Sequence, residues 1–307
     1  MAVTLIHPDR GDVGRRVDRV LLRHLAHLRG ASRNRLQRLI DQGAVRINGA
    51  PITRSSRRVL AGDAIAVDLP LQRARRPPIP ETLPLNVLYE DDGLVIVDKP
   101  SGQVSHPSFG NRTGTLLNAL LAYADGRWAP ALVSRLDKGT SGLVLIAKDR
   151  GMQAVLQRLG ARNAIEKDYL AVVRGRPPVK GTIDLALDRD PWDRRRVAVR
   201  DRGGVPSVTT FQRLRTQAVA CDQQISLVRC RLVTGRMHQI RVHLAAKGWP
   251  IVGDSVYGTK SEAIARQALH AWRLSFTHPV TRARVDVTAP IPKDIELLLR
   301  QSGVMSE

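Results

Sequence analysis

The chain has 307 residues, enough for one large domain and a smaller one, and 43% of them are hydrophobic, which excludes a largely disordered chain. Lysine and arginine number 49 against 28 acidic residues, so the formal charge is +21 and a nucleic acid is the first candidate partner. Charge alone does not choose between RNA and DNA, and arginines spread over solvated surfaces would give the same total.

The sequence carries no signal for export or for a membrane. Residues 1–20 lack the apolar run of about seven residues that a signal peptide needs, and no run of about 18 uncharged apolar residues occurs. We therefore expect a cytoplasmic protein. Its cysteines, Cys221 and Cys230, have no CxxC partner or nearby ligand set, and we interpret them as reduced, space-filling thiols.

The N-terminal part predicts a small module of two helices and a few strands. Residues 16–28 place apolar side chains on one helical face, and a second helix begins at Ser32 and ends at Gly43. Asn48-Gly49 predicts a hairpin within residues 45–52, and residues 64–69 alternate as a strand. The first helix presents Val17, Val20, Leu21, Leu25 and Leu28, and the second presents Leu36, Leu39 and Ile40.

Residues 15–69 carry R-x-D, S-R-x-x-L-Q-x-L-I, G-x-V-x-x-N-G and A-G-D in that order. This series resembles the small RNA-binding domain of ribosomal small-subunit protein four. The resemblance implies that phosphates contact Arg33, Arg35, Arg38 and Arg46, and such contacts position a protein on RNA. By pattern alone, these arginines could equally be the solvated side of the module.

Proline interrupts every periodicity between Gln72 and Pro80. We therefore expect an RNA-binding domain at residues 1–72, a Pro/Arg-rich linker at 73–84 and a catalytic domain at 85–307. In the last, residues 87–100 predict strand, acidic turn and strand, and residues 115–121 predict a helix.

A single carboxylate stands out in Ser134-Arg135-Leu136-Asp137-Lys138-Gly139-Thr140-Ser141-Gly142. Turn-forming residues follow Asp137, and the apolar run 143–148 predicts a buried strand. Neighbouring cations would favour the ionised carboxylate, which suits a nucleophile or a general base. An ordinary surface aspartate in a loop would give the same spacing.

The next elements are a helix from Met152 to Leu159, which Gly160 can end, and a β-rich run at 167–175 that contains Tyr169. Residues 208–214 and 225–232 also predict strands. Between them, Trp192 lies in the charged run 189–202, beside Arg194, Arg195 and Arg196. An aromatic ring in a basic run suits stacking on single-stranded RNA, and a solvated hairpin tip is the equal alternative.

Residues 234–244 read T-G-R-M-H-Q-I-R-V-H-L, and residues 248–258 contain G-x-P-I-x-G-D-x-x-Y-G. His238 and His243 stand five apart without a nearby acid, so the sequence predicts no metal site. Residues 253–261 fit a phosphate-binding loop poorly, because the Gly-Lys pair is absent. Residues 269–279 read L-H-A-W-R-L-S-F-T-H-P.

Together these motifs resemble, in order and over nearly the whole chain, those of the RluA-type pseudouridine synthases. Their signature is H-R-L-D-x-x-T-S-G-L-L-L-x-A-K, and the usual histidine is Ser134 here, which bears on how the loop is held. The resemblance implies an Asp137 nucleophile paired with Arg241, Tyr169 stacked on the uracil as a candidate base, and Leu274 lining the pocket. It implies substrate contacts for Arg135 and Thr140.

The implied fold is α+β, with a long mixed and largely antiparallel sheet, plus the small α/β domain. The implied activity is isomerisation of specific uridines without a cofactor, through attack of Asp137 on either uracil C6 or ribose C1′. Large-subunit ribosomal RNA is the first expected substrate, and tRNA the second. A non-catalytic RNA-binding or ribosome-assembly factor and a DNA-binding regulator are the alternatives. The sequence leaves the oligomeric state open, with a monomer as the working expectation.

Overall fold

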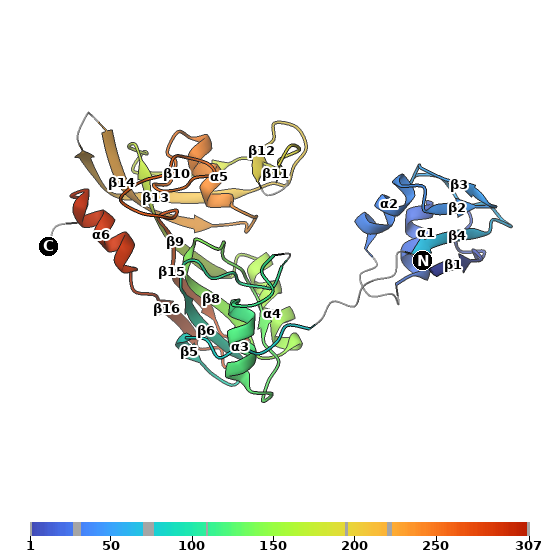
Figure 1. Cartoon of the computed structure of the whole chain (residues 1–307), viewed down its shortest axis with the longest axis horizontal. Helices are drawn as coiled ribbons and strands as arrows, with labels where there is room; N and C mark the ends of the chain where they lie inside the picture. Colours follow the sequence, from blue (N-terminus) through green and yellow to red (C-terminus); the bar gives the residue numbers. More distant parts are fainter. Residues whose placement is uncertain are drawn as a thin grey trace. The chain divides into compact units, whose positions relative to one another are not determined.

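The computed structural model describes residues 2–26, 32–69, 77–108, 110–193, 196–219 and 223–305. By its internal contacts the chain divides into two units, Met1–Pro77 and Pro78–Glu307 (Figure 1). Leu28, Cys221, Arg194 and Arg195, and residues 73–76 of the expected linker, lie outside the described residues. Within the described part of the chain, no helix is both long and apolar enough to cross a membrane.

The N-terminal unit is a small antiparallel sheet covered by two helices. Its strands run in the spatial order β1-β4-β2-β3, and the apolar faces of α1 and α2 close the core around Ile47, Ile65 and Val67. The elements are β1 (Ala2–Ile6), α1 (Val17–His24), α2 (Arg33–Asp41), β2 (Val45–Ile47), β3 (Ala50–Pro51) and β4 (Ile65–Leu69).

Local sequence signals account for most of this unit. Asn48 and Gly49 both have positive φ, at 52° and 82°, as the predicted two-residue hairpin between β2 and β3 requires. Ser32 precedes α2 as predicted, although its side chain makes no capping hydrogen bond. Strand β1 was not predicted, and it forms because all five of its residues pair with β4.

The second unit is built on one long mixed sheet. Among the described residues ten strands join it, in the main order β10-β13-β14-β9-β15-β8-β6-β5, with β16 beside β15 and β7 beside β8. The bounds are β5 (Asn86–Glu90), β6 (Leu94–Lys99), β7 (Ala131–Leu132), β8 (Ser141–Ala147), β9 (Ile165–Arg174), β10 (Lys180–Asp184), β13 (Val208–Val219), β14 (Gln223–Leu232), β15 (Leu269–Thr277) and β16 (Arg284–Thr288).

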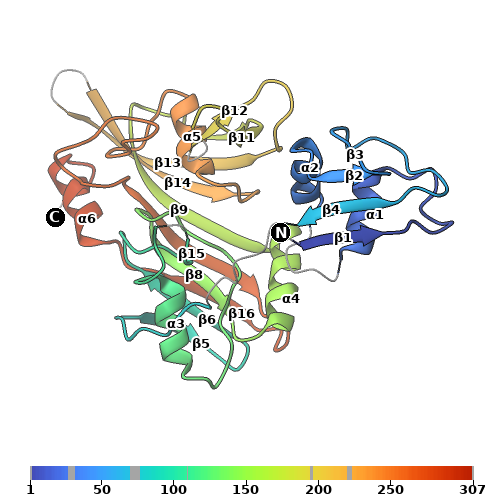
Figure 2. The same ribbon diagram turned by 45° about the vertical axis from the view of Figure 1, so that its right-hand side comes forward.

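Neighbouring strands are antiparallel except β8 and β15, the one parallel pair recorded in this sheet for the described residues. This arrangement confirms the predicted fold class, α+β with a long, largely antiparallel mixed sheet. A separate hairpin, β11 (Leu187–Arg189) and β12 (Val197–Val199), lies beside α5 (Gln239–Ala246) at one end of the unit, whereas β5 and β6 lie at the other end (Figure 2).

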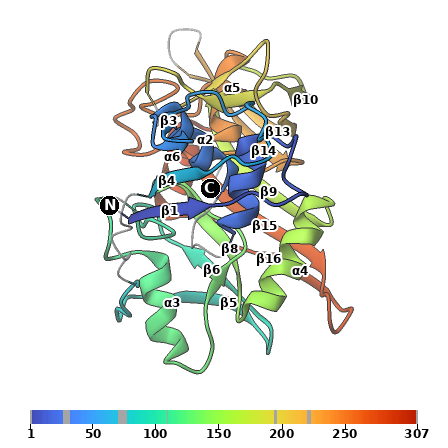
Figure 3. The same ribbon diagram turned by 90° about the vertical axis from the view of Figure 1, so that its right-hand side faces the viewer.

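Two helices cover opposite faces of β6 and β8 (Figure 3). Leu116 and Leu120 of α3 (Leu116–Ala124) pack with Val95 and Val144. Leu156 of α4 (Arg150–Ala161) packs with the alternate residues of the same strands, among them Leu94, Ile96, Leu143 and Leu145. The last helix, α6 (Lys293–Gln301), buries its apolar side in the cluster that contains Tyr169.

The structure corrects two expectations about this unit. Gly160 does not end the fourth helix, which continues to Ala161, and the left-handed residue that follows it is Asn163, with φ 57°. In addition, part of the expected linker is fixed to the catalytic unit. The Asn118 side chain of α3 donates to the Ile79 carbonyl at 2.7 Å, and the Glu81 N–H donates to the Asn118 carbonyl at 3.0 Å.

Candidate active site

The turn before β8 holds Asp137 through backbone hydrogen bonds. The Thr140 N–H donates to the Asp137 carbonyl at 3.1 Å, and the Gly102 N–H donates to the Lys138 carbonyl at 2.7 Å. The Ser105 hydroxyl fixes the other side of the turn, because it donates to the Leu136 carbonyl at 2.9 Å. The carboxylate stays partly exposed, at 24% of its side chain, so a substrate can reach it.

The end of the turn lies directly against β15. Gly142 has φ 108° and pairs with Ala271, and a Cβ at Gly142 would lie 2.2 Å from the Ala271 carbonyl oxygen. Only a residue without a side chain fits so close to the neighbouring backbone. The parallel pairing of β8 with β15 therefore depends on this glycine.

Arg241 on α5 contacts the carboxylate of Asp137. Its Nη1 donates to Asp137 Oδ2 at 2.9 Å, although the two residues are 104 positions apart in the sequence. The other edge of the guanidinium donates to Asp254, from Nε at 2.7 Å and from Nη2 at 2.9 Å. The backbone N–H groups of Val256 and Tyr257 also donate to Asp254 Oδ1, so Asp254 is itself held in place.

Both members of the buried Arg241–Asp254 pair remain charged. Burial alone would lower the pKa of Arg241, but the hydrogen bonds and charge of Asp254, with the charge of Asp137, raise it above its usual value. Burial likewise opposes ionisation of Asp254, and its bonds from Arg241, Val256 and Tyr257 nevertheless lower its pKa. A permanent cation therefore faces Asp137 and donates a charge-assisted hydrogen bond to it.

His238 lies on another side of the same carboxylate, with Nε2 at 3.8 Å from Asp137 Oδ2. Its Nδ1 is 2.8 Å from the hydroxyl of Tyr257, which accepts the Val197 N–H at 2.9 Å. The Tyr257 hydroxyl can therefore donate a hydrogen bond to His238 Nδ1. In that arrangement the ring proton of His238 is on Nε2, which faces Asp137. Burial lowers the pKa of His238, against the charge of Asp137, so the ring is neutral near pH 7.

The charge of Asp137 also affects the pKa of two further side chains, Tyr169 and Lys99. Burial first, and then the charge of Asp137, raise the pKa of Tyr169 on β9, so the phenol keeps its proton at neutral pH. Lys99 is fully buried at the end of β6, and its Nζ donates to the carbonyls of Pro100 and Gln103 at 2.7 and 2.9 Å. Burial lowers the pKa of Lys99 to about 8, against the charges of Asp137 and Asp98.

The residues expected to contact substrate fall into different environments. Arg135 is exposed next to Asp137. Thr140 is buried, and its hydroxyl accepts from the Gln267 side chain at 3.2 Å, which makes it a support of the turn. Leu274 packs in the core cluster of Leu94 and Phe276, whereas Tyr169 belongs to a different cluster. Leu274 is therefore at the buried strand position that its periodicity alone indicates.

In the N-terminal unit, two of the four arginines expected on RNA are in ion pairs. Arg33 Nε lies 3.1 Å from Asp18, and Arg46 Nη2 lies 2.9 Å from Asp68. Of the other two, which lie on α2, Arg38 is exposed and Arg35 is partly buried. Asp18 is fully buried and also receives Arg16 at 3.0 Å, so one carboxylate holds two half-exposed guanidinium groups in place.

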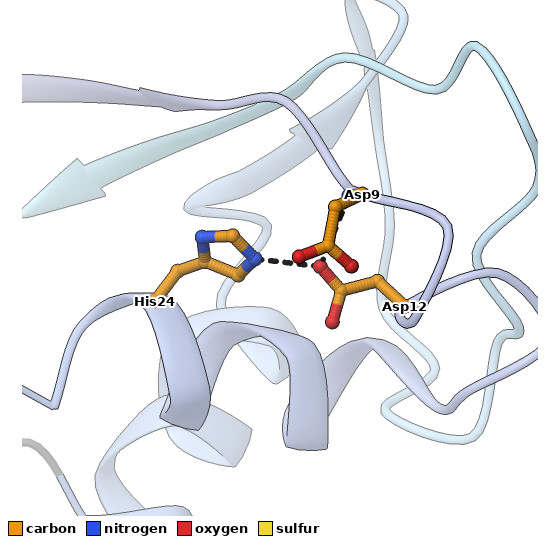
Figure 4. Close-up of side chains that lie close together, drawn as sticks. All are labelled: Asp9, Asp12 and His24. Atoms are coloured by element: carbon orange, nitrogen blue, oxygen red, sulfur yellow. Dashed lines mark hydrogen bonds and ion pairs between the residues drawn. The ribbon is translucent and has the colours of Figure 1, made fainter.

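A second polar cluster joins Asp9, Asp12 and His24 in the same unit (Figure 4). His24 Nε2 lies 2.6 Å from Asp12 Oδ2. The spacing of these ligand atoms would suit a cation, but Arg23 already donates to both carboxylates, at 2.8 Å each. Because this guanidinium bonds to both carboxylates from α1, the cluster serves to fasten the loop before α1 to that helix.

Comparison with known sequences identifies the family to which this fold and this site belong. The profile of the RNA pseudouridylate synthase family matches residues 93–246, and that of the S4 domain matches residues 15–65. The chain is 37% identical over 305 residues to the ribosomal large subunit pseudouridine synthase D of Zymomonas mobilis, which covers 94% of both chains.

The same name belongs to a relative from Neisseria meningitidis, 40% identical over 301 residues, which cover 93% of this chain and 78% of the relative. These similarities define an RNA-modifying isomerase. The chain belongs to the RNA pseudouridylate synthase family, as its motifs predict, and its N-terminal unit contains an S4 domain.

Solved structures agree on the fold. Human RNA pseudouridylate synthase domain containing 1 superposes with a TM-score of 0.56 at 24% identity, over 73% of this chain and 97% of that protein. Human RNA pseudouridylate synthase domain containing 4 gives a TM-score of 0.57 at 23% identity, over 72% and 94% of the two chains.

Sequence reasoning did not assign a role to Asp254, Tyr257 or His238. All three lie in motifs that were recognised, 234–244 and 248–258, so the signal was present. Spacing along the chain could not find them, because only the fold brings both motifs to Asp137.

Proposed function

We propose that this enzyme converts specific uridines of large-subunit ribosomal RNA into pseudouridine, with Asp137 as the nucleophile. The observation that carries the proposal is the 2.9 Å contact between Arg241 and the half-buried carboxylate of Asp137. The names of the relatives from Zymomonas mobilis and Neisseria meningitidis support the ribosomal target. A ribosomal substrate is in keeping with the cytoplasmic location that the sequence predicts.

A stacked uridine must leave its helix before Asp137 can reach it, which costs a few kcal/mol that RNA contacts offset. The ionised carboxylate then attacks uracil C6 or ribose C1′, and the bond between N1 and C1′ breaks. The freed ring turns and bonds to C1′ through C5, the bond between the ring or ribose and Asp137 breaks to release the carboxylate, and C5 loses its proton while N1 carries one. Arg241 directs the carboxylate of Asp137 toward the substrate through its hydrogen bond to Oδ2.

Tyr169 supplies the ring against which the uracil stacks. Because its pKa is raised, the phenol enters the reaction protonated. Burial is the main cause of that raised pKa, so Tyr169 can act as a base only in a complex that changes its buried surroundings. Arg135, two residues before Asp137, is exposed and suits contact with the RNA backbone around the displaced uridine.

The N-terminal unit holds the RNA. We propose that Arg33, Arg35, Arg38 and Arg46 contact phosphates, and that the stretch 73–84 separates this function from catalysis in 85–307. Fixed pairing of Arg33 with Asp18 reduces the side-chain freedom lost on binding. Contacts of this kind are independent of base identity and weaken as salt rises.

The test is pseudouridine mapping of total RNA from cells that lack the chain, complemented with the native protein, Asp137→Asn or Asp92→Asn. Asp92 is an exposed aspartate in the turn between β5 and β6, so it serves as the matched control. We expect particular large-subunit pseudouridines to vanish, and the native and Asp92→Asn proteins to restore them. Asp137→Asn should restore none.

Other outcomes would replace parts of the proposal. Loss of pseudouridines from tRNA alone would contradict the ribosomal target. Restoration by Asp137→Asn would contradict the nucleophile. Persistence of every pseudouridine in the deletion strain, with salt-dependent binding of the protein to RNA, would favour a non-catalytic binding factor.

A further inference from the structure

The hairpin β11–β12 carries an aromatic side chain that the fold does not use. Trp192 at its tip is 95% exposed, and Tyr123, the next most exposed aromatic residue among those described, is at 37%. A tryptophan normally buries most of its large apolar surface, so such exposure on a folded loop marks a contact surface.

Hydrogen bonds define the loop that presents Trp192. The side chain of Asp190 accepts the N–H groups of Trp192 and Asp193, at 2.8 and 3.2 Å. The Asp190 N–H donates to the Arg196 carbonyl at 3.1 Å, and the Arg196 N–H donates to the Asp193 carbonyl at 2.8 Å. These bonds hold the backbone at 190–193 and at Arg196, among the described residues of the hairpin, which reduces the ordering cost of binding.

The base of the hairpin is attached to the active site. The Val197 N–H donates to Tyr257, whose hydroxyl contacts His238, and His238 faces Asp137. Arg196 Nη2 also donates to the Val256 carbonyl at 2.9 Å, next to Tyr257. Leu187 and Val197 pack with Val242, the neighbour of Arg241 on α5. The hairpin thus starts two side chains away from the nucleophile.

Val197 is five positions after Trp192, and an extended chain of that length spans at most about 17 Å. Only the Tyr257 and His238 side chains then separate Val197 from Asp137, so the tip is within reach of RNA that flanks a uridine bound there. The chain carries a formal charge of +21, and the active site at the base of the hairpin acts on RNA, so nucleic acid is the partner that fits this surface.

We infer that Trp192 stacks on an unpaired base of the RNA substrate near the target uridine, and that the β11–β12 hairpin is an RNA-binding arm of the catalytic unit. This inference rests on the proposed function and specifies how the substrate is held. Stacking on an aromatic ring accepts any base, so the arm contributes affinity and position rather than a sequence code.

The test compares Trp192→Ala, Trp192→Leu and Trp192→Phe, with Val280→Ala as the matched control. Val280 is an exposed apolar residue, 69% exposed, in the turn between β15 and β16. The substrate is a protein-free large-subunit ribosomal RNA transcript. KM and kcat are measured for each protein, and the Kd for the same RNA is measured in an Asp137→Asn background, in which no turnover occurs.

We expect alanine and leucine at position 192 to raise KM and Kd by about 5- to 100-fold, the range for loss of one stacked base, with kcat unchanged at saturation. Phenylalanine should keep most of the affinity, and Val280→Ala should behave as the native chain. Ultraviolet cross-linking should join the peptide that contains Trp192 to a nucleotide near the modified one.

Native KM and Kd in Trp192→Ala, from an active preparation, would overturn the inference and leave the proposed function standing. Native affinity in Trp192→Leu would also overturn it, because an apolar contact would then suffice without a ring. If the native chain modifies no site in this RNA, the Kd series in the Asp137→Asn background still tests stacking. A loss of affinity on Trp192→Ala in that background upholds it, and unchanged affinity rejects it.

Discussion

Asp254 receives two hydrogen bonds from Arg241, at 2.7 and 2.9 Å, and so determines which edge of the guanidinium faces Asp137. We predict that Asp254→Asn lowers kcat by about 100-fold, because an amide accepts only one of these bonds and leaves Arg241 poorly directed. The free energy of unfolding should fall by about 3 kcal/mol, since a buried charge loses its partner. Chemical denaturation and single-turnover kinetics measure the two effects.

The control for this variant is Asp286→Asn. Asp286 pairs with Arg273 on the exposed side of β15 and β16, where the pair is screened by solvent. That substitution should cost less than about 1 kcal/mol and leave kcat unchanged. Equal effects of the two variants on kcat would show that Asp254 does not position Arg241.

The hydroxyl of Tyr257 joins the Val197 backbone to His238. Tyr257→Phe removes this oxygen and keeps the aromatic ring. The guanidinium carbon of Arg241 lies 5.1 Å from the centroid of that ring. Loss of one orienting hydrogen bond, worth about 1–1.5 kcal/mol, should reduce kcat about tenfold. KM for the RNA should stay unchanged, and a rise in KM with native kcat would contradict the positioning role.

Tyr123→Phe is the matched control for the loss of a tyrosine hydroxyl. The Tyr123 hydroxyl donates to Glu90 at 2.6 Å on the exposed side of α3. We expect native kcat and KM from this variant, because neither residue is among the partners that the structure records for Asp137.

Gly142 is predicted to tolerate no side chain. Gly142→Ala should destabilise the catalytic unit by more than about 4 kcal/mol, since its Cβ would overlap the Ala271 carbonyl and its φ is 108°. Gly126→Ala isolates the backbone contribution, because φ there is 72° with no atom within 4 Å of the added Cβ. That control should cost about 1–2 kcal/mol. Urea denaturation measures the free energy of unfolding of both variants. A similar loss in the two would contradict the close approach of Gly142 to the Ala271 carbonyl.

The N-terminal unit should lose stability in acid through Asp18. Burial opposes ionisation of Asp18, but hydrogen bonds from Arg16, Gln37 and Arg33 lower its pKa to about 2. A lowered pKa in the folded state gives stability that is present above the unfolded value of 3.8 and disappears as pH falls through about 2. Its size is at most about 2 kcal/mol.

Amide hydrogen exchange in α1 measures this contribution in the whole chain. Protection of the Leu21 N–H should be greater in the native protein than in Asp18→Asn at pH 6, and the difference should vanish near pH 2. A difference that stays constant down to pH 2 would show that the carboxylate charge is not responsible.

The sequence predicted the parts of the fold that depend on residues close together in the chain. Asn48-Gly49 specifies its own turn, and the apolar runs at 94–97 and 143–147 favour strands inside a sheet. Strand β1 escaped prediction because it depends on a partner that lies more than 60 residues away, at β4. At Gly160 a local signal misled the prediction instead. A glycine in the last turn of a helix need not end that helix, and this one continues to Ala161.

The same distinction holds at the active site. Asp137 stood out because its turn and the following strand are local, but its predicted role, like that of Arg241, came from resemblance to a family. Asp254 and Lys99 were not found, because their importance comes from burial and from partners in other segments. Leu274 was assigned to the pocket by resemblance, and that role stays a prediction; its packing in one cluster with Phe276 is what its strand periodicity alone indicates.

The pairing of β8 with β15 also has a consequence for the time at which the enzyme becomes active during its own synthesis. Asp137 is translated before the middle of the chain, but Arg241, Asp254 and the partner strand of Gly142 come more than 100 residues later. A nascent chain that ends before Leu269 has no strand to pair with Ser141 and Gly142, the part of β8 that follows the Asp137 turn. The surroundings of Asp137 are therefore completed only when nearly the whole chain has been synthesised.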